Sequence, residues 1–164
     1  MLSNHWKNRT TVALDSIADL SAEHRAVLAQ GPIVFFDGVC NICNRSVNTL
    51  LNLDKKGKLR YASLQGDLSE SLFGKLVGDP DSVRLTVQKQ ESRLTILDGF
   101  DAFLEITVLL FPWSRPFLFL FRIPPLIYPG RWVYKWVARN RYRWFGKREF
   151  CDISHLKFKD RFLN

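Results

Sequence analysis

Apolar residues follow a regular pattern through the first half of the chain. Four consecutive large apolar residues at 33–36 end in Asp-Gly, which is typical of a fully buried strand closed by a turn. Residues 41–53 then carry apolar side chains at helical spacing with polar residues between them, and a Lys-Lys-Gly sequence ends this amphipathic helix. We expect a second strand at 58–64 and a short helix around 70–77.

The following segments alternate with the period of a strand. Residues 82–88 and 92–98 exchange apolar and polar positions, so they predict an antiparallel hairpin. A helix is expected after Gly99 and should be broken at Pro112. The order β-α-β-α-β-β-α predicts an α/β core at 32–112, with a mixed four-stranded sheet flanked by helices.

The two ends of the chain differ from this core. Residues 1–31 are polar, and Ser21 can cap a short helix, so we interpret them as an N-terminal extension that packs loosely. No continuous apolar stretch precedes a small-residue cleavage site there, and we expect no signal peptide. Residues 113–164 are interpreted as an aromatic, basic helical appendage packed on the core.

The appendage is expected to hold two helices. The Phe-Leu repeat at 117–121 is interpreted as a buried helix, 122–130 as a Pro-rich turn, and 131–145 as a helix ended by Gly146. Charged residues divide the apolar stretch before this turn, so it does not reach the roughly 20 residues of a membrane-spanning helix.

Positive charge is concentrated on the last of these helices. The formal net charge of the chain is +8, and seven cations against one anion between 131 and 150 give that segment +6. We expect its cations to remain hydrated while its large aromatic side chains cover the sheet or the preceding helix. Those side chains are Trp132, Trp136, Trp144 and Phe145.

An alternative gives this helix a function of its own. Basic and aromatic side chains over 131–148 would then form a non-enzymatic binding module for anionic lipid, nucleic acid or a partner protein. Nucleic acid is the least favoured of the three, and the wider region 113–148 is kept as a peripheral membrane or protein contact.

Two cysteines stand where the buried strand meets its helix. Cys40 and Cys43 are three positions apart, so they share one face of the first helical turn, where a disulfide can form. Cys40 comes at the helix start, where unpaired N–H groups and the helix dipole favour a thiolate. This context predicts a redox pair in which Cys40 attacks a substrate disulfide and Cys43 resolves the mixed disulfide. Two buried thiols without chemistry are the alternative.

Other residues near this motif carry weaker expectations. Asp37 either takes the proton of Cys43 or is a turn residue that caps the helix. A zinc site would need both cysteines together with Cys151 and His155, more than a hundred residues away, so we expect no metal and no dissociable cofactor. Cys151 is expected to be partly buried and idle. Three cysteines in all favour a reducing, cytoplasmic compartment.

Three segments together resemble one protein family, the DCC family of thiol-disulfide oxidoreductases: VFFDGVCNICN, KGKLRYASLQ and ARNRYRWFGKREFC. The family is named for an Asp-Cys-Cys trio, which here is Asp37, Cys40 and Cys43, and the resemblance covers about 33–163. It implies a thioredoxin-like fold, activity of the protein-disulfide reductase type, and protein or small-molecule disulfides or thiols as substrates.

The chain departs from the expected pattern at two positions. Phe100 stands where the family typically has a small polar residue ahead of an Asp-Ala pair. Pro80 is the nearest candidate for the cis-proline that usually precedes the third strand of a thioredoxin-like fold.

Overall fold

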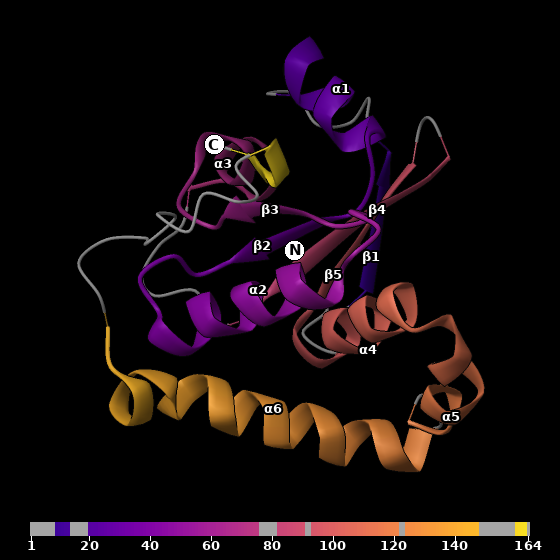
Figure 1. The fold of residues 1–164 in the computed structure, drawn as a ribbon, viewed down its shortest axis with the longest axis vertical. Helices are drawn as coiled ribbons and strands as arrows, with labels where there is room; N and C mark the ends of the chain where they lie inside the picture. Colours follow the sequence, from indigo (N-terminus) through magenta and orange to yellow (C-terminus); the bar gives the residue numbers. More distant parts are fainter. Residues whose placement is uncertain are drawn as a thin grey trace, which may run out of the picture.

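The computed structural model describes residues 9–13, 20–75, 82–90, 93–121, 124–147 and 160–163. Within these residues one mixed sheet has the strand order β1-β5-β4-β2-β3-β6 (Figure 1). The strands are β1 (Arg9–Ala13), β2 (Ile33–Phe36), β3 (Arg60–Ser63), β4 (Arg84–Gln90), β5 (Arg93–Asp98) and β6 (Phe162–Leu163). The helices are α1 (Ala22–Ala29), α2 (Asn41–Leu53), α3 (Asp67–Phe73), α4 (Gly99–Leu110), η2 (Pro112–Ser114), α5 (Arg115–Leu120) and α6 (Pro124–Phe145).

The four central strands have the arrangement that the sequence predicts. β2 pairs in parallel with β3 and antiparallel with β4, and β4 and β5 form the antiparallel hairpin. The helix predicted at 41–53 has the same bounds as α2. The expected four-strand count is wrong, however, because β1 joins the edge at β5 and β6 joins the edge at β3. Both are edge strands without the apolar alternation from which a strand is predicted.

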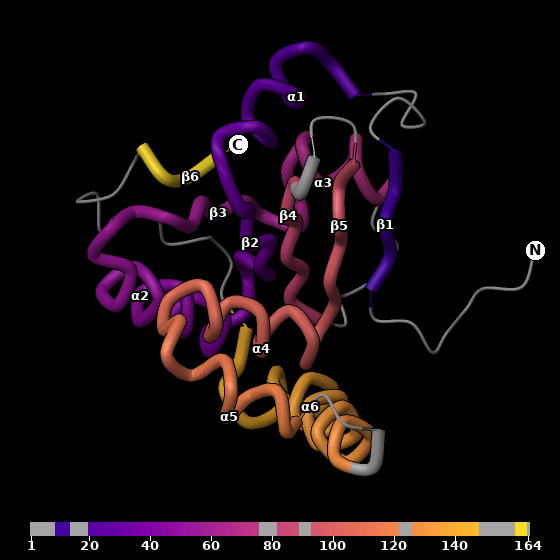
Figure 2. Tube along the Cα trace, turned by 90° about the vertical axis from the view of Figure 1, so that its right-hand side faces the viewer, coloured from indigo at the N-terminus to yellow at the C-terminus, as the bar shows by residue number. Residues whose placement is uncertain are grey.

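Helices cover both faces of the sheet, and α6 adds an outer layer beneath α2 and α4 (Figures 1 and 2). Successive residues of β2 point to opposite faces, and all four are buried. Val34 and Phe36 belong to one apolar cluster with residues of α2 and α4, whereas Ile33 and Phe35 belong to a second with residues of α1 and α3. This is why the strand is apolar throughout.

The segment expected as a loose extension is better packed than predicted. Ser21 caps α1 as expected, with its Oγ accepting the His24 N–H at 3.1 Å. Leu20 and Leu28 are buried in the second apolar cluster, so the loose packing expected for this helix is wrong.

The C-terminal region differs most from the sequence interpretation. α5 is not buried, since Phe117 and Phe119 are exposed. The Pro-rich stretch 124–130 forms the first turns of α6 rather than a loop, with Pro129 inside the helix. Pro124 and Pro125 fit the first helical turn because N–H groups there have no intrahelical partner, whereas Pro129 lies further in and leaves the carbonyl four residues before it without a helical N–H donor. Gly146 ends the helix as predicted, with φ of +74°.

The packing face of α6 is also the reverse of the expected one. The aromatic side chains expected to cover the core are exposed, namely Trp132, Trp136, Trp144 and Phe145. In their place Arg141, expected to be hydrated, is buried. Within the described part of the chain, every helix falls short of the length or apolarity that crossing a bilayer requires.

Candidate redox site

The turn between β2 and α2 places both cysteines at one helix N-terminus. Cys40 has extended backbone angles and is the N-cap of α2. Its Sγ accepts the backbone N–H of Cys43 at 3.4 Å, and its carbonyl accepts the N–H of Asn44 at 3.1 Å. The helix is therefore capped by a cysteine sulfur, so the interpretation of Asp37 as the cap is wrong, whereas its place as a turn residue is confirmed by the Val39 N–H bond to its carboxylate.

The surroundings of the two thiols move their pKa values in opposite directions. Hydrogen bonding from the Cys43 side chain lowers the pKa of Cys40 to about 7; the Cys43 N–H and the positive charge of Arg141 act in the same direction, against burial. The same hydrogen bond raises the pKa of Cys43, and burial and the negative charge on Cys40 raise it further. Of the two thiols, Cys40 is therefore the more readily ionised.

Asp37 is the centre of a buried polar cluster beside the thiols. Its Oδ1 accepts hydrogen bonds from the Val39 N–H at 3.2 Å and from Gln65 Nε2 at 2.9 Å. Its Oδ2 accepts hydrogen bonds from Arg141 Nη2 at 3.1 Å and from the Tyr142 hydroxyl. The side chains of Asp37 and Arg141 are almost fully buried, so water has little access to this ion pair.

Residues after β3 and on α2 hold the Asp-Gly turn itself. Gln65 Oε1 accepts the Ser63 hydroxyl at 2.6 Å and lies 3.4 Å from the Gly38 N–H. The buried Asn44 donates from Nδ2 to the Gly38 carbonyl at 2.8 Å. Both peptide groups of Gly38 are therefore bound, which fixes the direction in which Asp37 and Cys40 leave the strand.

The C-terminal end of α6 closes over Cys40. Asn41 Nδ2 donates to the Phe145 carbonyl at 2.7 Å, and Cys40 forms an isolated antiparallel bridge with Lys147. Lys147 Nζ also lies 4.2 Å from the centre of the Tyr142 ring. As a result Cys40 has an exposed fraction of 0%, whereas Cys43 is partly exposed.

Two further side chains, Arg131 and Tyr134, fix the inner face of α6. Arg131 forms a two-pronged ion pair with Asp101 of α4, at 2.9 and 3.1 Å. The Tyr134 hydroxyl accepts the Val83 N–H at 3.2 Å, just before β4. Burial raises the pKa of Tyr134, so its hydroxyl stays neutral.

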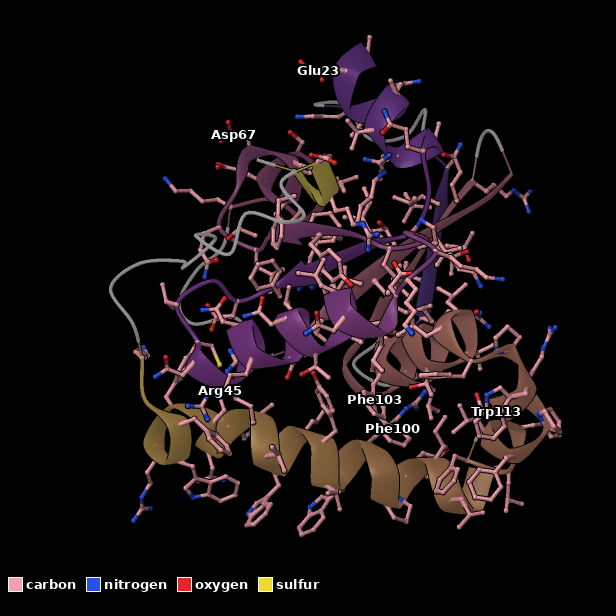
Figure 3. All side chains as sticks on the ribbon, viewed as in Figure 1. Glu23, Arg45, Asp67, Phe100, Phe103 and Trp113 are labelled. Atoms are coloured by element: carbon pink, nitrogen blue, oxygen red, sulfur yellow. The ribbon has the colours of Figure 1, made fainter. Side chains whose placement is uncertain are left out.

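A close approach between α4 and α6 accounts for the departure at Phe100. Phe100 points toward α6 (Figure 3). A Cβ placed on Gly130 would lie 2.5 Å from its ring, so the ring occupies the space that a larger residue at position 130 would need. The bulky side chain at position 100 therefore requires a glycine at position 130.

The structure brings together all three residues of the predicted trio. One ligand atom from each of Asp37, Cys40 and Cys43 lies within 4.8 Å of the others, a grouping that could in principle hold a metal ion. The carboxylate already accepts four hydrogen bonds, one of them from a guanidinium, so it is a poor ligand for a cation. Pro80, Cys151 and His155, which the sequence analysis considered, lie outside the described residues.

Sequence reasoning did not identify the partners of Asp37. Gln65, Arg141 and Tyr142 all lie in the segments that carry the family resemblance, and this was the available signal. No local pattern joins them, since more than a hundred residues separate Arg141 from Asp37.

The arrangement defines a class of protein: an α/β domain with a Cys-X-X-Cys pair that opens a helix after a buried strand. The chain belongs to the DCC1-like thiol-disulfide oxidoreductase family, whose model matches residues 34–147. The match begins in β2 and ends at Lys147, the residue bridged to Cys40. Both halves of the site thus lie inside the family region.

The chain is also similar to two proteins from distant organisms, of which the second is named as a DCC family protein. The uncharacterized protein YuxK of Bacillus subtilis is 34% identical over 139 residues, covering 80% of this chain and 93% of that protein. A chloroplastic DCC family protein of Arabidopsis thaliana is 29% identical over 149 residues, covering 89% and 84%. No solved structure matches the chain.

Proposed function

We propose that the protein is a thiol-disulfide oxidoreductase of the protein-disulfide reductase type, with a thioredoxin-like core, that reacts through Cys40 and Cys43. One observation carries the proposal: the Cys40 sulfur caps α2 beside the Arg141 guanidinium, and its pKa is about 7. A thiol with this pKa is substantially ionised near neutral pH and is matched to attack on a disulfide.

The reaction has two exchange steps. The Cys40 thiolate attacks a substrate disulfide, a mixed disulfide forms, and the departing substrate thiolate takes a proton. Cys43 then loses its proton and attacks the Cys40 sulfur, which releases the second substrate thiol and leaves a Cys40–Cys43 disulfide. The two electrons come from the cysteine pair, and an external thiol must reduce the pair again.

The geometry accounts for the order of these steps. In the reduced state the hydrogen bond to Cys40 and the charge on Cys40 raise the pKa of Cys43. The mixed disulfide removes that charge, so the pKa of Cys43 falls when its attack is needed. Asp37 has an oxygen within 4.8 Å of the Cys43 sulfur, and we assign it the role of receiving or relaying this proton.

Access is the remaining requirement, because Cys40 is fully buried. The residues over it are the end of α6 and Lys147, held by the Asn41 bond and the backbone bridge. We propose that this end lifts when a protein or small-molecule disulfide enters. In this proposal residues 32–112 form the redox core, residues 1–31 are its N-terminal extension and residues 113–164 are its C-terminal appendage. The proposed compartment is the reducing cytoplasm.

A redox titration with thiol alkylation and mass spectrometry tests the function. Wild type is compared with Cys40→Ser and Cys43→Ser at potentials set by reduced and oxidised glutathione. We expect a Cys40–Cys43 disulfide in wild type, a trapped mixed disulfide on Cys40 in Cys43→Ser, and no trapping in Cys40→Ser. Absence of the internal disulfide across biological potentials would rule the proposal out.

A further inference from the structure

The side of α6 away from α2 and α4 exposes large apolar side chains that no part of the described structure covers. Trp132 has an exposed fraction of 68% and Trp136 of 50%. Sticks with rings extend from α6 on this side (Figure 3). We call it the outer face and define it by three residues: Trp132, Trp136 and Trp144.

These side chains are not a core left uncovered by poor packing. The inner side of α6 is fully engaged through Arg131, Tyr134 and Arg141, which recur at helical spacing. Trp132 and Trp136 lie one turn apart on the opposite side of the helix. Trp136 and Trp144 contact each other edge to face, with ring centres 4.9 Å apart. In the isolated chain these rings are therefore exposed to water.

The charge around the outer face has one sign. The sequence contains no Asp or Glu from position 106 to position 148. Exposed cations of α6 lie among the aromatic residues, and these are Lys135, Arg139 and Arg143. An occupant of this face must therefore accept apolar rings and also carry negative charge.

We propose that the outer face docks on a membrane surface rich in anionic lipid, with α6 lying along the surface. Indole rings favour the boundary between headgroups and acyl chains, and neighbouring Arg and Lys side chains meet lipid phosphates there. The 22 residues of α6 give a contact about 33 Å long. This mode of contact needs no spanning helix.

The mixture of side chains favours lipid over the other occupants. Nucleic acid would use cations and stacking rings, but it gives no reason for exposed Leu126 and Val133 on the same helix. A second copy of the chain would bring two faces of the same positive charge together, which opposes pairing. An anionic bilayer satisfies both the apolar and the charged groups.

Binding of the full-length chain to vesicles tests the inference. Three of the five tryptophans belong to the outer face, so tryptophan emission reports contact directly. We expect a blue shift and co-sedimentation with vesicles of equal phosphatidylglycerol and phosphatidylcholine at 50 mM salt, weakened at 500 mM and absent with phosphatidylcholine alone. Failure to bind the anionic vesicles at low salt would overturn the proposal without touching the disulfide chemistry.

Matched variants separate the outer face from general basicity. Lys135→Gln/Arg139→Gln/Arg143→Gln should bind about 100-fold more weakly, at roughly 1 kcal/mol per cation. Lys55→Gln/Lys56→Gln/Lys75→Gln removes the same charge from exposed positions elsewhere and should bind as wild type does. Trp132→Ala/Trp136→Ala should co-sediment with the anionic vesicles more weakly than wild type. Equal losses in the two charge variants, or a dimer in light scattering that hides the tryptophans, would refute the inference.

Discussion

The two faces of α6 are made of the same kinds of residue and have opposite surroundings. On the inner face Arg141 is buried against Asp37. On the outer face Arg139 is exposed beside exposed indoles. Burying a guanidinium without a partner is strongly unfavourable. Whether an arginine of this helix is buried therefore depends on a carboxylate that it can pair with, and the basic pattern of the helix alone does not predict it.

The largest expected effect is on stability, from removing one arginine on each face. Arg141→Gln leaves the buried Asp37 carboxylate without its cation and should lower the free energy of unfolding by about 3–5 kcal/mol. Arg139→Gln is exposed and should stay within about 0.5 kcal/mol of wild type. Urea denaturation followed by circular dichroism measures both. Similar losses in the two variants would show that the faces do not differ as described.

The sequence predicted the central sheet well because its periods are local. The apolar run at 33–36 and the helical pattern at 41–53 both report burial along a few consecutive residues, and both elements form as predicted. Cys40 at the start of that helix could be placed for the same reason. Edge strands such as β1 lack this signal, since a strand with one partner needs no continuous apolar face.

The inner face of α6 could not be predicted from its pattern. Its ion-pair partners, Asp37 and Asp101, come from distant segments, and the largest aromatic residues lie on the other side. Gly130, which the sequence analysis placed in a turn, lies against the Phe100 ring of α4, where a Cβ has no room. A small residue at this position is a signal of close helix packing that the apolar pattern does not carry.

The second prediction concerns this close approach. Gly130→Ala places a methyl group against the Phe100 ring and should lower the free energy of unfolding by about 1–3 kcal/mol through overpacking. Phe100→Ser provides the small polar residue typical of the family and opens the space. In the Phe100→Ser background the same alanine should therefore have little effect, measured as coupling in a double-mutant cycle. Additive effects would mean that the two residues do not share this contact.

The third prediction tests whether the positive charge of Arg141 lowers the pKa of Cys40. The rate of Cys40 alkylation should follow its ionisation, rising with pH around a midpoint near 7. Arg141→Gln removes a charge that lowers this pKa, so the midpoint should move upward, and Arg141→Lys should partly restore it. The outer variant Arg139→Gln should leave the midpoint unchanged. A purely structural role for Arg141 would predict no restoration by lysine.

The sign of the matching stability effect follows from the same pKa. Cys40 titrates near 7 in the folded protein, against a reference of 9.0. Its thiolate therefore contributes fully to stability above pH 9, and the contribution is lost as the pH falls from 9 through 7. A Cys40→Ser variant should lack this part of the pH dependence, which pairs of urea titrations at pH 6 and pH 9 measure.

The smallest effect compares two asparagines that each bond a carbonyl of α6. Asn41 donates to Phe145 at 2.7 Å and ties the helix to the cysteine turn, whereas Asn140 donates to Trp136 at 2.8 Å within the helix itself. Both bonds are exposed, so each alanine variant should cost about 1 kcal/mol or less. Only Asn41→Ala loosens the cover over Cys40, and it alone should raise the alkylation rate of Cys40 several-fold at pH 8, where the thiol is already ionised. Equal rates in the two variants would mean that the end of α6 does not control access to the thiolate, and that Cys40 is reached by another path.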